Sequence, residues 1–167
     1  MALHILFYIW AIINFGAGLW EIYAFQNRYS LHLEKRTLWE KISAGQIDIR
    51  NFWIEGWSEY CKVDSRYIPT PQTSANYVWF FELLNAFLAP LFIIALLTKN
   101  YVILKLILAI SIFNCLGYFA TLLMESIHCS RHLQNAAQYA QWWMFPIYYL
   151  ISGIWLIVPW ILYIQLQ

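Results

Sequence analysis

Four long apolar runs divide the sequence, and only a few polar residues interrupt each of them. The runs cover residues 2–25, 77–97, 101–124 and 142–166. A helix of about 20 residues is long enough to cross the hydrocarbon core of a bilayer. None of the runs shows the strict alternation of apolar and polar residues that a membrane β-barrel requires. The pattern therefore predicts four transmembrane helices.

The connections between these runs differ in length and in charge. The second and third connections are short, which predicts that the helices they join are antiparallel neighbours. The first connection, residues 26–76, holds most of the charged residues. A link of this length inside so small a protein is usually functional. We expect it to fold as a lid over one end of the bundle, with an amphipathic surface helix over residues 31–43 and an extended turn at residues 69–71.

Composition agrees with a membrane protein. Hydrophobic residues make up 62% of the 167 residues and charged residues 11%, whereas an average soluble protein has roughly 45–50% and about 25%. Aromatic residues reach 20%, which suits a protein with long perimeters at two lipid–water interfaces. The fold class that we expect is all-α: a single domain over residues 1–167, built as an integral membrane bundle of four helices with a long folded first link.

Charge and cysteine usage exclude several classes of function. The formal net charge of +1 argues against nucleic-acid binding by a basic surface. Cys61, Cys115 and Cys129 follow no metal-ligand spacing, and an odd count is no disulfide framework. His128 and His132 lack further obvious ligands. We expect neither a metal nor another cofactor; the expected partners are an apolar small molecule from the bilayer and membrane lipid, and a homodimer stays open.

Polar residues within the spans recur every three or four positions, so they form one stripe on each predicted helix. Each of them costs free energy in lipid unless it faces the interior of the bundle. The simplest packing therefore points all four stripes inward. The stripes contain Asn14, Gly18 and Glu21; Glu82 and Asn85; Asn114, Tyr118, Thr121 and Glu125; and Tyr148, Ser152, Trp155 and Pro159.

Alternating helix directions place these residues at two depths. Glu21 and Glu82 lie roughly 6–8 Å below one surface, and the three asparagines and Ser152 roughly 12–17 Å deep. This arrangement predicts a pocket with an amide-lined floor and a carboxylate-lined mouth that opens toward the first link.

Plainer interpretations exist for several of these residues. Glu21 and Glu125 are near enough to the surface for interfacial solvation alone. Asparagines between membrane helices often only bond a neighbouring helix. Glu82 is deeper and follows three aromatic residues, 79–81, which favours a functional role.

The end of the first link contains a specific string. Residues 57–68 read WSEYCKVDSRYI. This string resembles W-x-E-Y-x-K-x-D-S-R-Y-I, a hallmark of the emopamil-binding protein (EXPERA) family, just before the second span of its sterol isomerase. The resemblance covers about residues 57–159, with Ser152 where the family usually has Asn. Its further matches are Glu82, Pro90, Asn114, Gly117, Glu125, Trp155 and Pro159.

The resemblance implies a multi-pass bundle in the endoplasmic reticulum membrane, with cytoplasmic termini and a cavity for sterols or amphipathic amines. The Lys and Arg count alone favours the opposite orientation, and we follow the resemblance. It also implies sterol double-bond migration, in which acidic residues and a histidine move protons and a Trp stabilises the cation. The chain departs from this pattern in the first span, where Asn14 and Gly18 stand in place of the family's His and Glu. We therefore expect a divergent member that acts on a terpenoid, sterol-like or polyketide substrate.

These residues predict an isomerase or cyclase that transfers protons without a cofactor. Glu82, among aromatic residues, is the candidate acid, and Glu21 is the candidate base at a different position along the substrate. Trp155 is expected to hold a developing cation over its ring. Gly18 is expected to leave room for a ligand beside Glu21. The expected substrate-binding residues are Asn14, Asn85, Asn114, Tyr118, Thr121, Glu125, Tyr148, Ser152 and Trp155.

The lid and the alternative function complete these expectations. Glu59, Asp64 and Arg66 are expected to pair with one another and to fix the lid. The alternative is a non-catalytic protein that binds sterols, other lipids or amines, in which Glu82 anchors an amine and no proton moves.

Overall fold

The computed structural model of the chain describes residues 2–69, 76–128 and 131–167, and the elements in these ranges are all helical. Four helices are long and apolar enough to cross a membrane: α1 (Ala2–Gln26), α4 (Asn76–Leu97), α5 (Tyr101–His128) and α7 (Met144–Gln165). The prediction of an all-α, multi-pass membrane bundle is confirmed. The other elements are η1 (Arg28–Ser30), α2 (Leu38–Ser43), α3 (Ile49–Cys61), η2 (Ser65–Tyr67) and α6 (Arg131–Tyr139).

The chain divides into two compact units. Unit 1 consists of residues 1–22, 80–120 and 150–167, and unit 2 of residues 23–79 and 121–149. Unit 1 thus contains most of each long helix. Unit 2 contains the first link and the connection between α5 and α7.

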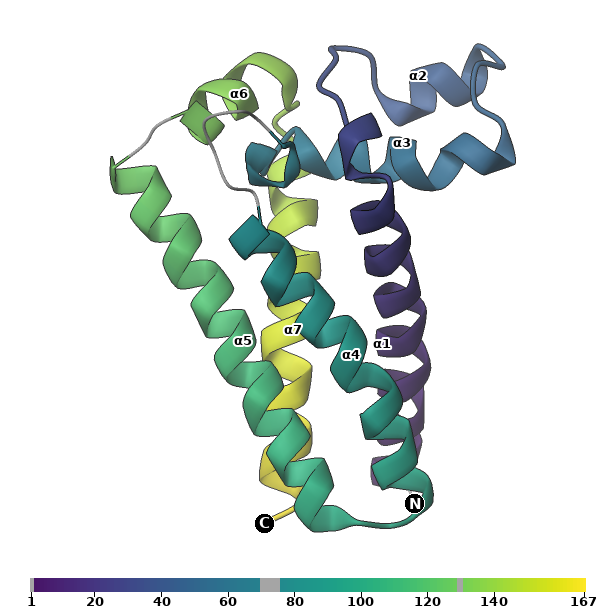
Figure 1. The fold of residues 1–167 in the computed structure, drawn as a ribbon, viewed down its shortest axis with the longest axis vertical. Helices are drawn as coiled ribbons and strands as arrows, with labels where there is room; N and C mark the ends of the chain where they lie inside the picture. Colours follow the sequence, from purple (N-terminus) through teal and green to yellow (C-terminus); the bar gives the residue numbers. More distant parts are fainter. Residues whose placement is uncertain (1, 70–75, 129–130) are drawn as a thin grey trace. The chain divides into compact units, whose positions relative to one another are not determined.

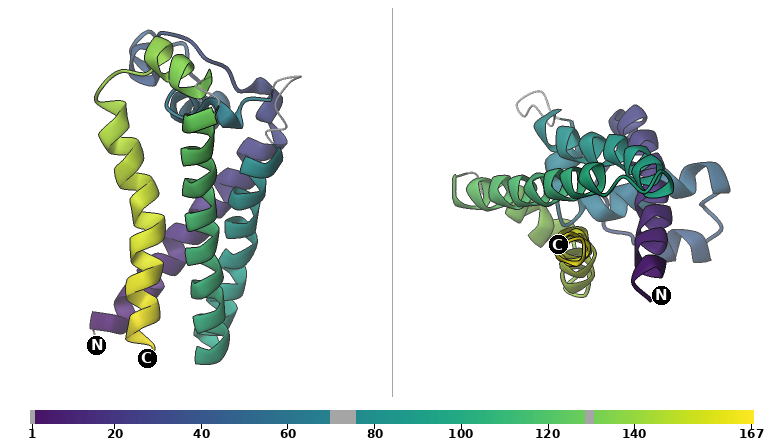
Figure 2. Two further views of the ribbon diagram at one scale, coloured as in Figure 1. Left: turned by 90° about the vertical axis from the view of Figure 1, so that its left-hand side faces the viewer. Right: turned by 90° about the horizontal axis from the view of Figure 1, so that it is seen from below.

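In unit 1 the long helices alternate in direction. The start of α1, the end of α7 and the connection between α4 and α5 lie at the same end of this unit (Figure 1). Helices α4 and α5 lie side by side in every view (Figure 2). The antiparallel arrangement expected from the short second connection is therefore present.

All four long helices contribute to one apolar core in unit 1. The core residues are Phe7, Trp10, Ala11, Leu88, Phe92, Ala95, Leu96, Leu104, Ile107, Leu108 and Leu162. The opposite faces of the helices are apolar as well, and Ile12, Val102 and Phe113 are more than 70% exposed. Lipid tails cover such surface at no cost, so this exposure is expected of a membrane span.

One prediction about the links is wrong. The first link is helical over Leu38–Ser43 rather than 31–43, because the Thr37 side chain caps the helix there. The Thr37 hydroxyl accepts from the Glu40 N–H at 3.2 Å, and the Glu40 carboxylate accepts from the Thr37 N–H at 2.6 Å. This capping box fixes the helix start. In the third connection, α5 continues to His128 and a further helix, α6, follows it. Residues 70–71 of the expected turn at 69–71 lie outside the described part of the chain.

Glycine allows the closest approach between α1 and α4. A Cβ added at Gly18 would lie 2.9 Å from the Cα of Ala86, which is closer than real Cβ atoms come to backbone. The expectation that Gly18 leaves room for a ligand is therefore wrong, because the backbone of α4 fills that space. Gly117 on α5 similarly admits the ring of Phe81, whose Cε1 would lie 2.9 Å from an added Cβ.

We predict that Gly18→Ala lowers the thermal stability of the detergent-solubilised protein, because the new methyl group forces α1 away from α4. Overpacking of this kind costs about 1–3 kcal/mol, more than the up to about 1 kcal/mol that Ala gains over Gly in a helix. Gly16→Ala is the matched control, since an added Cβ there meets nothing within 4 Å. Equal melting temperatures for the two variants would contradict this account of the α1–α4 contact.

Candidate functional site

Most of the predicted polar residues gather in unit 1. Asn14 and Glu21 come from α1, Asn85 from α4, Asn114 from α5 and Ser152 from α7, and all five are buried. This confirms that the polar stripe of each long helix faces inward. Polar groups of a membrane span gain hydrogen-bond partners only inside the bundle, which explains the orientation.

The two candidate catalytic carboxyl groups meet in unit 1. The Glu21 carboxyl is 6% exposed and is hydrogen-bonded to the Glu82 carboxyl. Their encounter follows from the contact between Gly18 and Ala86, which lie one turn before Glu21 and one turn after Glu82 and bring the two helices together. The sequence assigned the acid and the base to different positions along a substrate, and these two roles stay a prediction. The two groups form one carboxyl pair.

The geometry of this pair has a chemical consequence. A carboxylate can only accept hydrogen bonds, so a hydrogen bond between two carboxyl groups requires a proton on one of them. Two ionised carboxylates in hydrogen-bond contact in a desolvated site would also repel each other. A pair of this kind can hold one proton that it donates, beside an oxygen that can accept one.

Phe81 anchors α5 beside the carboxyl pair. The Asn114 side-chain amide donates to the Phe81 carbonyl oxygen at 2.7 Å. The ring of Tyr118 meets the Phe81 ring edge-on, with centroids 6.4 Å apart. Gly117 contacts the same ring. One residue of α4, next to Glu82 in sequence, thus positions three residues of α5, including two of the predicted site residues.

Trp155 occupies a different part of unit 1 from the one expected. Its ring packs edge-on against Trp10, with centroids 5.4 Å apart, and it borders the apolar core. No described contact joins it to Glu21 or Glu82, so its expected role above a developing cation stays a prediction.

Three buried polar atoms in unit 1 form no hydrogen bond within the described part of the chain. They are Oε2 of Glu21, Oδ1 of Asn114 and Nε1 of Trp155. Leaving such an atom unsatisfied costs about 1–3 kcal/mol. Two of the three accept hydrogen bonds and one donates, and all three belong to residues that the sequence identified as site residues. A ligand with polar groups could satisfy these atoms.

The remaining predicted residues lie in unit 2, where an ion pair organises them. Arg66 donates to both carboxylate oxygens of Asp64, from Nε at 2.7 Å and from Nη2 at 2.6 Å. The Arg66 Nη1 also donates to the Thr121 hydroxyl at 3.0 Å, and the Tyr148 hydroxyl donates to Asp64 Oδ2 at 3.1 Å. Both charged residues are buried. This network connects η2 with α5 and α7, so Thr121 and Tyr148 hold unit 2 together.

Glu59 does not join that pair. It forms an ion pair with Lys62 at 2.7 Å and accepts from the N–H of Leu38 at 3.1 Å. Lys62, only 2% exposed, donates in addition to the Arg36 carbonyl oxygen at 2.6 Å. Glu59 therefore fastens the start of α2 to α3, and the expected mutual pairing of three charged residues holds only for Asp64 and Arg66.

Aromatic rings from the same string of sequence fill the interior of unit 2. Trp57 packs on Tyr67 and on Trp79, with centroids 5.1 and 5.4 Å apart. Tyr60 lies 4.8 Å from the ring of Tyr148. The Trp79 indole donates to the Tyr67 carbonyl oxygen at 3.2 Å. The string at residues 57–68 thus builds the core of this unit, and its role as a lid stays a prediction.

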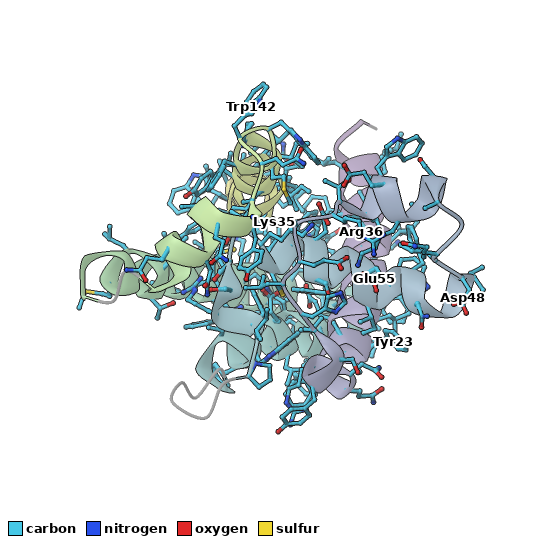
Figure 3. All side chains as sticks on the ribbon, turned by 90° about the horizontal axis from the view of Figure 1, so that it is seen from above. Tyr23, Lys35, Arg36, Asp48, Glu55 and Trp142 are labelled. Carbon is cyan, nitrogen blue, oxygen red and sulfur yellow. The ribbon has the colours of Figure 1, made fainter. Side chains whose placement is uncertain are left out.

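One group of described side chains has the composition of a metal site. The ligand atoms of His32, Glu34 and Glu55 lie within 4.8 Å of one another. The buried Lys41 ammonium forms ion pairs with both glutamates, and His32 Nε2 lies 3.3 Å from its Nζ. An ammonium group in this position supplies the positive charge that a metal would. Figure 3 shows Glu55 on α3, with Asp48 at the turn between α2 and α3.

Sequence reasoning missed Lys41 and Lys62 as buried residues. Both are isolated basic residues in a charged link, which usually indicates exposure. For Lys62 the one local signal is Glu59, three residues earlier; the partners of Lys41 are seven and fourteen residues away, so no local pattern indicates its burial. The side chain of Glu125, and those of His128 and His132, lie outside the described residues.

Comparisons of the chain with protein-family models, with curated proteins and with solved structures gave no significant match.

We predict that Arg66→Ala strongly destabilises unit 2, because it leaves the Asp64 carboxylate buried without its counter-ion. Breaking a buried pair by removing one partner costs about 3–5 kcal/mol. Limited proteolysis and thermal unfolding would measure the loss. Arg36→Ala is the control: that side chain is exposed and bonds only the Gln46 side chain, so we expect a change within about 0.5 kcal/mol. Unchanged protease resistance in Arg66→Ala would contradict a structural role for the pair.

Proposed function

We propose that this chain is a membrane-embedded isomerase or cyclase that transfers protons to and from an apolar terpenoid, sterol-like or polyketide substrate. The observation that supports the proposal is the hydrogen-bonded pair of Glu21, which is buried, and Glu82, which is half-buried, inside unit 1. A substrate of this kind enters from the lipid. The reaction uses no cofactor, because the pair provides both a proton and a site that accepts one.

Two reactions fit such a pair. In an isomerisation, the protonated carboxyl adds its proton to one alkene carbon, and the other alkene carbon becomes cationic. The carbon on the far side of this cationic carbon then loses a proton to a carboxylate oxygen, which shifts the double bond. In a cyclisation, the same proton goes to an epoxide oxygen, the C–O bond breaks, and the π electrons of an alkene form the new C–C bond. The final cation returns a proton to the pair. Both reactions leave the protein as it began.

The unsatisfied polar atoms of unit 1 favour a substrate that carries oxygen. Asn114 Oδ1 and Glu21 Oε2 need a hydrogen-bond donor such as a hydroxyl, and Trp155 Nε1 needs an acceptor such as a carbonyl, hydroxyl or epoxide oxygen. Asn14, buried on the same helix as Glu21, adds an amide that can both donate and accept. An unfunctionalised hydrocarbon would leave these groups unsatisfied.

The resemblance to the EXPERA family supports the same class of reaction and a location in the endoplasmic reticulum membrane. The residues that depart from the family pattern support a different substrate. Asn14 stands where the sterol isomerase has its histidine and cannot carry a proton at physiological pH. Sterol double-bond migration is therefore not the proposed reaction.

A non-catalytic lipid- or amine-binding protein is the second candidate. The unsatisfied buried atoms and the replacement of the family's histidine by Asn14 would both suit such a protein. In that case the carboxyl pair holds the polar group of a ligand and its proton does not move.

We predict that Glu82→Gln abolishes product formation while leaving folding and ligand binding intact. Gln keeps the shape and can hydrogen-bond to Glu21, but it has no acidic proton. Losing one general acid lowers the rate by at least about 100-fold. Metabolite profiling of a strain that lacks the protein identifies the substrate for this assay. Glu40→Gln is the matched control on an exposed residue. Ligand binding by the unmodified protein with no product formed would favour the binding protein.

We also predict that the unmodified protein does not rescue a yeast strain that lacks its sterol isomerase. The physical reason is that Asn14 replaces a proton-carrying histidine. The measurement is growth and sterol composition, with a functional sterol isomerase as the positive control and an immunoblot to show equal expression. Full rescue would restore sterol isomerisation as the function.

A further inference from the structure

Large apolar side chains outside the transmembrane spans are exposed on α2 and α3 of unit 2. Trp39 is 74% exposed and Ile49 is 83% exposed. Ile42, Phe52 and Trp53 are each between 38% and 47% exposed. We refer to these five residues as the α2–α3 face. A group of exposed apolar side chains of this kind, rich in tryptophan, indicates contact with something other than water.

The face is distinct from the core of unit 2. On α3, the buried side chains Ile54, Trp57 and Cys61 follow one another at helical spacing and point into the unit. Ile49, Phe52 and Trp53 are spaced by three and four residues on another side of the helix. Helix α3 is therefore apolar on two sides, and only one of them packs against its own unit.

In the first link, basic residues outnumber acidic ones outside the ion pairs of Lys41, Lys62 and Arg66. Between residues 28 and 66 the chain has seven basic and six acidic residues. The buried ion pairs of Lys41, Lys62 and Arg66 use three of the basic residues and four of the acidic ones. Four basic residues against two acidic residues are left outside these pairs. Lys35 and Arg36 are among the basic ones and are exposed beside α2 (Figure 3).

We propose that the α2–α3 face docks on the anionic surface of a lipid bilayer. This requires the first link to lie on the cytoplasmic side, which the Lys and Arg count favours, and not on the side that the EXPERA resemblance implies. Tryptophan is the residue most suited to the headgroup region, because its ring is apolar and its N–H finds polar partners there. Basic residues next to an apolar face attract anionic lipid, at about 1 kcal/mol for each residue near the surface. Trp39 follows the end of the first span at Gln26 by only thirteen residues, so the chain keeps this face within reach of a bilayer. The proposal is independent of the proton chemistry.

Site-directed spin labelling of the full chain tests this proposal. Trp39→Cys and Ile49→Cys each receive a nitroxide in a Cys129→Ser background, and the protein is reconstituted into phosphatidylcholine vesicles with or without phosphatidylserine. Cys61 and Cys115 are buried, and burial together with Asp64 raises the pKa of the Cys61 thiol well above its usual value, so it reacts poorly with the label. Collision rates with oxygen, which concentrates in lipid, and with a water-soluble nickel complex report the position of each label.

We expect the ratio of oxygen to nickel collisions to be several-fold higher at residues 39 and 49 than at the exposed control Lys35→Cys. The ratio should fall when phosphatidylserine is omitted. Equal exposure to nickel at all three positions would overturn the proposal. Spin–spin broadening at residue 39 that disappears on dilution with unlabelled protein would also overturn it, because the face would then be covered by a second copy of the chain.

Discussion

The hydrocarbon of a bilayer offers no hydrogen bonds, and this constraint organises the polar residues of the four spans. A polar side chain in a span must find its partner inside the protein. Asn14, Glu21, Asn85, Asn114 and Ser152 are buried for this reason, although they come from four different helices. The same constraint makes the few unsatisfied polar atoms informative, because no lipid tail can satisfy them. They occur on residues around the carboxyl pair and on Trp155.

Close helix packing determines which polar groups meet. Gly18 lets the backbone of α1 approach Ala86 of α4, and this contact brings Glu21 to Glu82. Gly117 admits Phe81, whose carbonyl oxygen holds the Asn114 amide. The two glycines therefore allow the close helix contacts that position these polar groups. Neither glycine has to be explained as leaving space for a ligand. In unit 2 the corresponding role belongs to a charged pair, since Asp64 and Arg66 connect η2 to α5 and α7.

The sequence predicted the elements that depend on composition and period. The four spans, their directions and the inward polar stripes follow from long apolar runs and from spacings of three and four residues. The first link was harder, because its structure depends on contacts between residues far apart in sequence. The start of α2 is set by a local cap at Thr37, whereas Lys62 is buried because it meets Glu59 and the Arg36 carbonyl oxygen. The pairing of Glu21 with Glu82 could not be foreseen either: the period gives the face of each residue, and the glycine contact sets the distance.

The central claim is that Glu21 and Glu82 share one proton inside the bundle, and infrared spectroscopy of the full chain in lipid nanodiscs tests it directly. A protonated carboxyl group gives a carbonyl stretching band that is separate from the carboxylate bands and that shifts in heavy water. The account predicts such a band at neutral pH in the unmodified protein, and its loss when both residues are replaced by Gln. A spectrum of the unmodified protein at neutral pH with carboxylate bands alone would contradict it.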